Sequence, residues 1–212
     1  MILFIAITAI VLAYCLGSLS FAVIVSRLMH LDDPRTFGSG NPGATNVLRS
    51  GKKTAALLTL IGDGAKGWFA IWLAFTLLPP YLPIGTQSLI IFAIALAVMI
   101  GHLYPLFFGF HGGKGVATAC GIMLALHPYL GLSVLTVWLI IATVLRISSL
   151  AAVVAAISAP FFALYWLTDK TYIAAVFIVA ILVLRRHKRN ILDLLKGKET
   201  KIGQANNPPS EH

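Results

Sequence analysis

Seven runs of apolar residues dominate the chain, and they restrict its fold more than any other feature. The runs cover residues 2–26, 54–78, 88–108, 116–127, 129–145, 149–167 and 171–184. About 20 apolar residues are enough for an α-helix to cross the hydrocarbon core of a bilayer. Only 11% of the residues are charged, whereas a soluble domain has roughly a quarter. The sequence therefore predicts an all-α, polytopic membrane protein, with residues 1–202 forming one membrane-integral domain.

The number of spans depends on the stretch from 116 to 145, which is too long for one helix and contains "HPY" at His127–Tyr129. Proline removes a backbone donor and disfavours helical geometry in the preceding residue. A tight turn at this point gives seven spans, and one kinked helix gives six. The run 2–26 is too long for the apolar core of a signal peptide and lacks its basic start, so we expect it to be retained as a span.

Basic residues are distributed unevenly among the connections between the runs. One set of connections carries Arg27, Arg35, Arg49, Lys52, Lys53, Lys114, Arg146, Arg185, Arg186, Lys188, Arg189, Lys196, Lys198 and Lys201. The alternate connections carry only Lys170. Seven spans place the whole basic set on one side, as the positive-inside rule requires. The pattern favours a periplasmic N-terminus and a cytoplasmic C-terminus, and it explains the net charge of +9 without a nucleic-acid partner. Residues 203–212 are predicted to form a disordered cytoplasmic tail.

Two glycine-rich loops lie on this basic side. The first, "GSGNPGATNVLR" from Gly38 to Arg49, combines three glycines with serine, asparagine and threonine. Such a loop can turn backbone N–H groups toward an anion, and an arginine can grip a phosphate. The second, "HGGKGVAT" from His111 to Thr118, adds a lysine at the start of a helix. Each loop alone fits a flexible turn equally well, but two on one face suggest one polyanion or two phosphorylated molecules.

Other polar residues allow two interpretations each. In "RRHKRNIL", a basic stop-transfer anchor explains the arginines, but it does not explain His187 and Asn190 on one helical face. Asp63 and Lys66 predict a structural ion pair near a helix end, with a proton relay as the alternative. Ser148 and Ser149 are expected to cap a helix.

The remaining chemistry-bearing residues give no sign of a metal or cofactor. Cys15 and Cys120 lie in apolar runs and are expected to be small hydrophobic residues. The histidines are expected at the interface, with His102 in an aromatic belt. The sequence has no G-x-S-x-G elbow and no H-x-x-x-x-D pair, and the aspartate cluster of CDP-alcohol phosphotransferases is incomplete.

Four motifs together resemble those of the bacterial acylphosphate:glycerol-3-phosphate acyltransferases. They are "GSGNPGATNVLR", "GHLYPLFFGFHGGKGVAT", "SSLAA" and "RHKRNI", and the resemblance spans about residues 14–202. It implies a seven-helix enzyme of the bacterial inner membrane, with its active site facing the cytoplasm. It also implies acyl transfer from acyl phosphate to the 1-hydroxyl of glycerol 3-phosphate, giving lysophosphatidic acid and phosphate. No cofactor is implied, and the donor phosphate itself takes the proton. Functional coupling to an enzyme that makes acyl phosphate is a further expectation.

The resemblance assigns residues to this chemistry motif by motif. The implied catalytic residues are Ser39, Arg49, Lys114, His187 and Asn190. The implied substrate-binding residues are Gly38, Gly40, Asn41, Gly43, Thr45, Asn46, Gly112, Gly113, Gly115 and Ser149. Two other classes compete with an enzyme: a transporter or channel for an anionic solute, and a non-catalytic lipid-binding protein. Clustering of the loops on one side, without an internal repeat, disfavours a transporter. A lipid-binding protein would leave the serine, asparagine and glycine residues unused.

Overall fold

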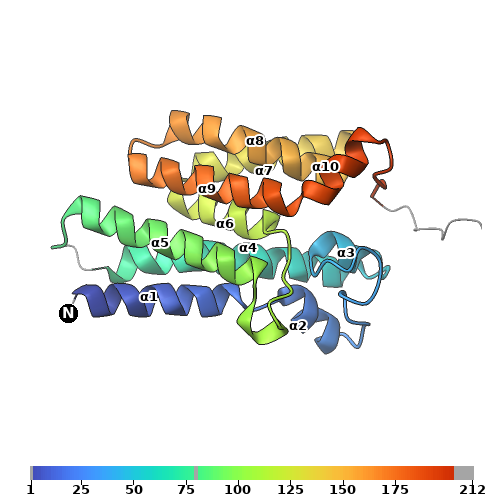
Figure 1. Cartoon of the computed structure of the whole chain (residues 1–212), viewed down its shortest axis with the longest axis horizontal. Helices are drawn as coiled ribbons and strands as arrows, with labels where there is room; N and C mark the ends of the chain where they lie inside the picture. Colours follow the sequence, from blue (N-terminus) through green and yellow to red (C-terminus); the bar gives the residue numbers. More distant parts are fainter. Residues whose placement is uncertain (1, 79–80, 203–212) are drawn as a thin grey trace, which may run out of the picture.

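The computed structural model describes residues 2–78 and 81–202, and these residues form helices joined by short connections (Figure 1). The helices are α1 (Ile2–Gly17), α2 (Phe21–Leu28), α3 (Ala44–Leu48), α4 (Lys53–Leu77), α5 (Ile84–Leu103), α6 (Val116–Leu126), α7 (Pro128–Val144), α8 (Ser148–Trp166), α9 (Lys170–Arg186) and α10 (Lys188–Leu195), with a 3₁₀ turn η1 (Leu106–Phe108). The described part of the chain contains no strand, which confirms the all-α prediction. The predicted tail, 203–212, lies outside the described residues.

Each apolar run corresponds to a helix, but the first run is broken. Helices α1 and α2 meet at a bend of 47°, at a break of three residues that hydropathy alone does not reveal. By length and apolar composition, Ile84–Phe108 and Ser148–Trp166 each qualify as a membrane span, and the bent pair counts as a third. Helix α4 carries charged side chains, and α6 and α7 are shorter than 18 residues. The helix positions therefore follow the prediction more closely than the span count does.

The connection between α6 and α7 is a turn. Helix α6 ends at Leu126, His127 has extended backbone angles, and Pro128 begins α7. A side chain placed at Gly131 would collide with the backbone of Leu124, which lies on the preceding helix. These two residues could not approach each other in one continuous helix, where seven residues span about 10 Å. The stretch 116–145 is therefore two helices that fold back on each other.

Glycines allow two pairs of helices to touch backbone to backbone. On the α4–α6 contact, a side chain at Gly67 would collide with Thr118, and one at Gly121 with Gly64. On the α1–α5 contact, a side chain at Gly101 would collide with the carbonyl of Tyr14. Small residues provide close packing where lipid removes the hydrophobic drive between helices. These contacts fix α4, α5 and α6, whose ends carry the loops described below.

The predicted ion pair within the second apolar run is confirmed, with a correction to its place. Lys66 Nζ lies 2.9 Å from Asp63 Oδ1, and both side chains are buried. The pair lies in the middle of α4 and not near its end, because the helix begins at Lys53, well before the charges. Cys15 and Cys120 are free thiols, as expected from their positions in apolar runs.

Candidate active site

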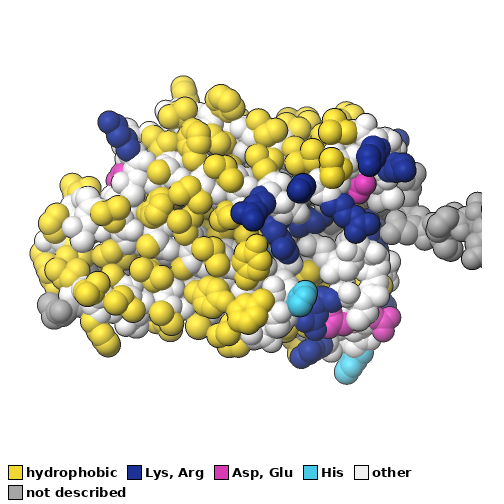
Figure 2. Space-filling model, viewed as in Figure 1, with side chains coloured by type: hydrophobic (Ala, Val, Ile, Leu, Met, Phe, Trp, Pro, Cys, Tyr) yellow, Lys and Arg dark blue, Asp and Glu magenta, His cyan; other side chains and the backbone are white. Residues whose placement is uncertain are grey.

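The polar residues singled out from the sequence gather at one end of the helix bundle. This end carries α2, α3 and α10 and the connection that leads into α6, whereas α1 begins at the opposite end (Figure 1). Lys and Arg side chains crowd the same end, and apolar side chains cover most of the rest of the visible face (Figure 2). The two glycine-rich loops and the α9–α10 junction therefore lie on one strongly basic surface.

Arg186 holds the second glycine-rich loop against α9. Its Nε donates to the carbonyl of Gly113 at 3.1 Å, and a terminal nitrogen donates to the carbonyl of Gly112 at 2.7 Å. The guanidinium also lies over the ring of Tyr104, with Cζ 5.6 Å from the ring centroid. Two hydrogen bonds to adjacent carbonyls leave the loop little freedom to rotate. The backbone of the loop is thus fixed immediately before Lys114.

Lys114 is joined to the last helix of the site by a short hydrogen bond. Its Nζ donates to Oδ1 of Asn190 at 2.6 Å, and Nδ2 of Asn190 donates to Oε1 of Glu199 at 2.8 Å. Burial lowers the pKa of Lys114, the nearby Glu199 opposes this, and Arg49 and two arginines of the α9–α10 region lower it further. A partly buried ammonium among several arginines favours an added anion, which would relieve their mutual repulsion.

His187 is buried at the junction of α9 and α10. Nδ1 lies 2.8 Å from the carbonyl oxygen of Val183, so that nitrogen carries the proton and donates. Burial lowers the pKa of His187 to about 4, and the charges of Lys114 and Arg186 contribute to the same shift. The imidazole is therefore neutral at pH 7, and its Nε2 is left as a hydrogen-bond acceptor. An acceptor beside a cationic pocket suits a ligand that carries both a hydroxyl and a phosphate.

The first glycine-rich loop is shaped by Asn46. Its Oδ1 accepts from the backbone N–H of Ser39 at 3.0 Å, and its Nδ2 donates to the carbonyls of Pro34 at 2.6 Å and Phe37 at 3.1 Å. Gly38, next to this contact, has φ of 59° and sits against Asn46 and Arg49, so a side chain there would be strained and crowded. Asn46 is buried, so in this structure it organises the loop from within.

The other predicted residues of this loop lie toward the surface. Ser39, Thr45 and Arg49 are exposed, whereas Asn41 and Gly43 are half-buried. The loop adjoins the second one, because a side chain at Gly113 would come within 3.1 Å of the carbonyl of Pro42. Exposed hydroxyls and a guanidinium beside the Lys114 loop leave room for a second anionic group.

The segment after α10 closes over this basic surface. Arg49 donates to Oγ1 of Thr200 at 3.1 Å, and Arg146 donates to the carbonyl of Ile202 at 3.2 Å. The backbone N–H of Ile202 in turn donates to the carbonyl of Arg146 at 2.6 Å. Residues 199–202 therefore connect the first loop, the α7–α8 connection and Asn190.

Ser149 lies in the first turn of α8 with its hydroxyl unused. The side chain is buried, and its Oγ has no hydrogen-bond partner. The expected capping role is wrong, because the helix has Ile147 at its N-cap position and no side-chain capping bond. A buried hydroxyl without a partner is uncommon, and it leaves Ser149 free to bind a ligand oxygen.

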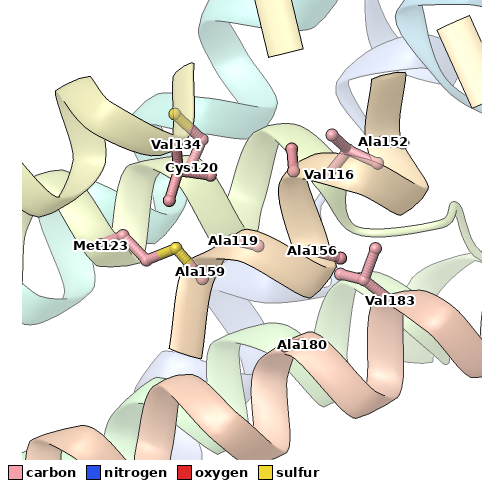
Figure 3. Close-up of a pocket in the computed structure, with 11 residues that line it drawn as sticks. Val116, Ala119, Cys120, Met123, Val134, Ala152, Ala156, Ala159, Ala180 and Val183 are labelled. Carbon is pink, nitrogen blue, oxygen red and sulfur yellow. The ribbon is translucent and has the colours of Figure 1, made fainter. Parts of the chain in front are cut away.

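A small apolar cavity lies between α6, α7, α8 and α9 (Figure 3). Its volume is about 20 Å³, and it is walled by Val116, Ala119, Cys120, Met123, Val134, Ala152, Ala155, Ala156, Ala159, Ala180 and Val183. Val116 follows Lys114 by two residues, and Val183 precedes His187 by one turn of α9. Apolar side chains therefore follow the polar groups within about one turn, around a cavity with room for roughly one water-sized group.

Comparison with known proteins decides the family. The family model for glycerol-3-phosphate acyltransferase matches residues 7–197. The chain belongs to the glycerol-3-phosphate acyltransferase family. Two curated relatives of that name, from Ralstonia nicotianae and from Neisseria meningitidis serogroup A, are 55% and 56% identical to it. Each alignment covers 93% of this chain, and it covers 94% and 98% of the respective relative.

Solved structures from the same family share the fold. PlsY (YgiH), an integral membrane glycerol 3-phosphate acyltransferase, aligns in its glycerol 3-phosphate form with a TM-score of 0.85 at 37% identity. That alignment covers 93% of this chain and 96% of the other. The lysophosphatidic acid form aligns with a TM-score of 0.84 at 36% identity, over 93% of this chain and 95% of the other. The protein is accordingly an acyltransferase of the membrane.

Some residues and contacts of the site could not be identified from the sequence alone. Arg186 belongs to a basic run whose arginines are fully explained as a membrane anchor, so its hydrogen bonds to the glycine loop were not expected. Glu199 lies beyond the last motif residue, and only the fold brings it to Asn190. The contact of Lys114 with Asn190, 76 residues apart, joins two motifs that the sequence could only list separately.

Proposed function

We propose that the protein transfers a fatty acyl group from acyl phosphate to the 1-hydroxyl of glycerol 3-phosphate. The products are lysophosphatidic acid and inorganic phosphate. The observation that carries this proposal is the contact of Lys114, in the second glycine-rich loop, with Asn190 of α10 near the neutral His187. The names of the related structures, a glycerol 3-phosphate form and a lysophosphatidic acid form, match the acceptor and the product.

In this proposal, glycerol 3-phosphate occupies the surface between the second loop and α10. Its phosphate binds Lys114, with the Gly112, Gly113 and Gly115 backbone around it. Asn190 and the unpartnered hydroxyl of Ser149 bind the glycerol oxygens, and Nε2 of His187 accepts from a hydroxyl. Charge-assisted hydrogen bonds of this kind are about twice as strong as neutral ones.

The acyl phosphate head group occupies the first loop. Ser39 and Thr45 are exposed there, and Arg49 can turn from Thr200 toward a phosphate. The backbone around this head group is formed by Gly38, Gly40, Asn41 and Gly43. The side chain of Asn46 holds the conformation of the loop through its hydrogen bonds. The acyl chain extends from this head group into the apolar region between helices or into lipid.

The reaction requires no protein nucleophile. The 1-hydroxyl oxygen of glycerol 3-phosphate attacks the acyl carbonyl carbon, and the bond from that carbon to the phosphate oxygen breaks. The departing phosphate takes the hydroxyl proton, so an ester and inorganic phosphate result. The protein contributes orientation of the two substrates and stabilisation of the negative charge by Lys114 and Arg49.

Seven spans, a periplasmic N-terminus and a cytoplasmic site complete the proposal. It is supported by the match of each apolar run to a helix, with the bent pair of α1 and α2 forming the first run, and by the separation of the start of α1 from α10 at opposite ends of the bundle (Figure 1). The basic surface then faces the cytoplasm of the bacterial inner membrane, where soluble glycerol 3-phosphate is available and an acyl-phosphate-producing enzyme could supply the donor.

One assay tests the proposal. Purified protein in detergent is mixed with palmitoyl phosphate and glycerol 3-phosphate, and lysophosphatidic acid is measured by mass spectrometry against phosphate release. One phosphate is expected for each lysophosphatidic acid. Reactions without protein and with glycerol in place of glycerol 3-phosphate serve as controls. Phosphate release without acyl glycerol 3-phosphate would mean hydrolysis, and it would overturn the proposed transfer.

A further inference from the structure

A buried cluster of charged and polar side chains lies outside the residues used above. Asp63 of α4 is 2.9 Å from Lys66 and 3.6 Å from Nδ1 of His102, at the end of α5. All three side chains are buried, with residue exposures of 3%, 2% and 7%. From the sequence, His102 is expected in an interfacial aromatic belt, because it lies near Tyr104. This prediction is wrong, since the side chain is buried. It faces inward, and its partner comes from another helix.

The cluster is tied to neighbouring elements at several points. Lys66 donates to the carbonyl of Leu19, in the break between α1 and α2, at 2.7 Å. Thr118 of α6 donates to the carbonyl of Asp63 at 2.9 Å. Charges inside a membrane domain are expensive, and a buried ion pair can often be replaced by apolar residues without loss of stability. Their presence in the bundle therefore calls for a role other than stability.

His102 contacts the second glycine-rich loop directly. The N–H of Gly113 donates to the carbonyl of His102 at 3.2 Å. A side chain at Gly112 would collide with that same carbonyl, and one at Gly113 would collide with Nε2 and lie 2.9 Å from Cε1 of the imidazole. The loop therefore rests on both the backbone and the ring of His102. Arg186 holds the same two glycines through their carbonyls.

We propose that His102 is a positioning residue: its imidazole, which lies beside Asp63 with Nδ1 3.6 Å from Oδ1, supports Gly113 and so sets the place of Lys114. Lys66 holds Asp63 in position through the same carboxylate oxygen, Oδ1, at 2.9 Å. The chain of contacts runs from the α4 charges through the ring to the loop, and the next residue is the lysine that binds phosphate. The inference rests on the proposed function, in which that phosphate belongs to glycerol 3-phosphate.

The prediction is a selective defect. In His102→Ala the loop keeps its contact with the backbone carbonyl but loses the support of the ring, and the KM for glycerol 3-phosphate rises about ten-fold or more, because small misplacements of a binding group are costly. The KM for acyl phosphate stays within about two-fold, since Asn46 shapes the first loop independently of the ring. Equal changes in both KM values would mean general damage, and they would overturn the inference.

A double variant tests the contact itself. Gly113→Ala alone raises the KM for glycerol 3-phosphate, because its methyl group collides with the imidazole. In His102→Ala/Gly113→Ala the methyl enters the space that the ring vacated, with the carbonyl of Pro42 at 3.1 Å giving way slightly. The double variant should therefore have a lower KM than Gly113→Ala alone. A KM equal to the product of the two single effects would refute support of the loop by the ring.

Two further variants separate positioning from stability. Ser88→Ala removes a polar contact of the same helix with Asp169 at the other end of α5, so it should lower Tm without changing either KM. His102→Asn keeps a donor near the position of Nδ1 but removes the atoms beneath Gly113, and it should show the KM defect with a Tm near that of the unmodified protein. The His102→Asn variant replaces His102→Ala if the latter does not fold. Unchanged KM values in His102→Asn would overturn the inference. An unmodified protein that makes no lysophosphatidic acid would refute the proposed function instead.

Discussion

Replacing Lys114 with alanine is the sharpest test of the site. The ammonium makes one hydrogen bond of 2.6 Å, to Asn190, and it is the one lysine of the second glycine-rich loop. Loss of a charge-assisted hydrogen bond to a ligand phosphate is worth about 1.5–3 kcal/mol. That range corresponds to a decrease in kcat/KM for glycerol 3-phosphate of roughly 10- to 150-fold. Asn190 is half-buried, so water can replace its lost donor, and the fold should survive.

The assay is a steady-state titration of each substrate in the same detergent. Lys52→Ala removes the same charge from an exposed residue before α4, and it should leave both KM values unchanged. If the basic residues act only as topological signals, the two variants will behave alike. Activity of Lys114→Ala within two-fold of the unmodified protein would refute the assignment of this lysine to the phosphate.

Three further outcomes follow from the structure. Burial lowers the pKa of His187 to about 4, so the unfolded chain binds a proton below pH 6.5 that the folded protein does not; stability should be complete above pH 6.5 and fall by about 2 kcal/mol at pH 5. His187→Gln should flatten that dependence in thermal melts at pH 7 and 5. Acyl phosphate should react faster than acyl-CoA at matched concentration, because the site offers two phosphate-sized loops, one for each substrate; a faster acyl-CoA reaction would contradict this. In a variant lacking Cys15 and Cys120, cysteines at Thr86 and Lys170 should react with an impermeant maleimide in intact cells, whereas labelling of Lys198→Cys would exclude a cytoplasmic C-terminal region.

The sequence predicts the helices well because hydropathy is a local property. The run 171–184 corresponds to α9 at Lys170–Arg186, and the proline after His127 marks the start of α7. Hydropathy does not reveal the break at Ser18–Ser20, because two serines around a leucine lower the mean hydropathy of a long apolar run only slightly. The bend depends on a tertiary contact: Lys66 donates a hydrogen bond to the carbonyl of Leu19, which lies in the break between the two helices.

The site was less accessible to sequence reasoning, for a different physical reason. Residue types pointed to Lys114 and Asn190, and the fold places them in contact. The supporting contacts depend on chain topology: Arg186 reaches the loop only because α9 packs beside α5, and His102 meets Asp63 only because α5 packs on α4. Ser149 was misjudged as a helix cap, since serine before an apolar helix has that role in most proteins. The catalytic and substrate-binding roles of these residues remain predictions.

The glycine contact between α1 and α5 has a consequence for biogenesis. Gly101 emerges from the ribosome about 80 residues after Gly17, which at 5–20 residues per second corresponds to roughly 4–16 s of translation. During that interval α5, the packing partner of α1, is not yet made. Of the folded-state partners of Asp63 and Lys66, Leu19 has been synthesised, whereas His102 and Thr118 have not. The nascent chain must therefore hold a charged helix in lipid with only part of its final set of contacts. A pause in translation before α5 would prolong the stage at which quality-control proteases can recognise the incomplete bundle.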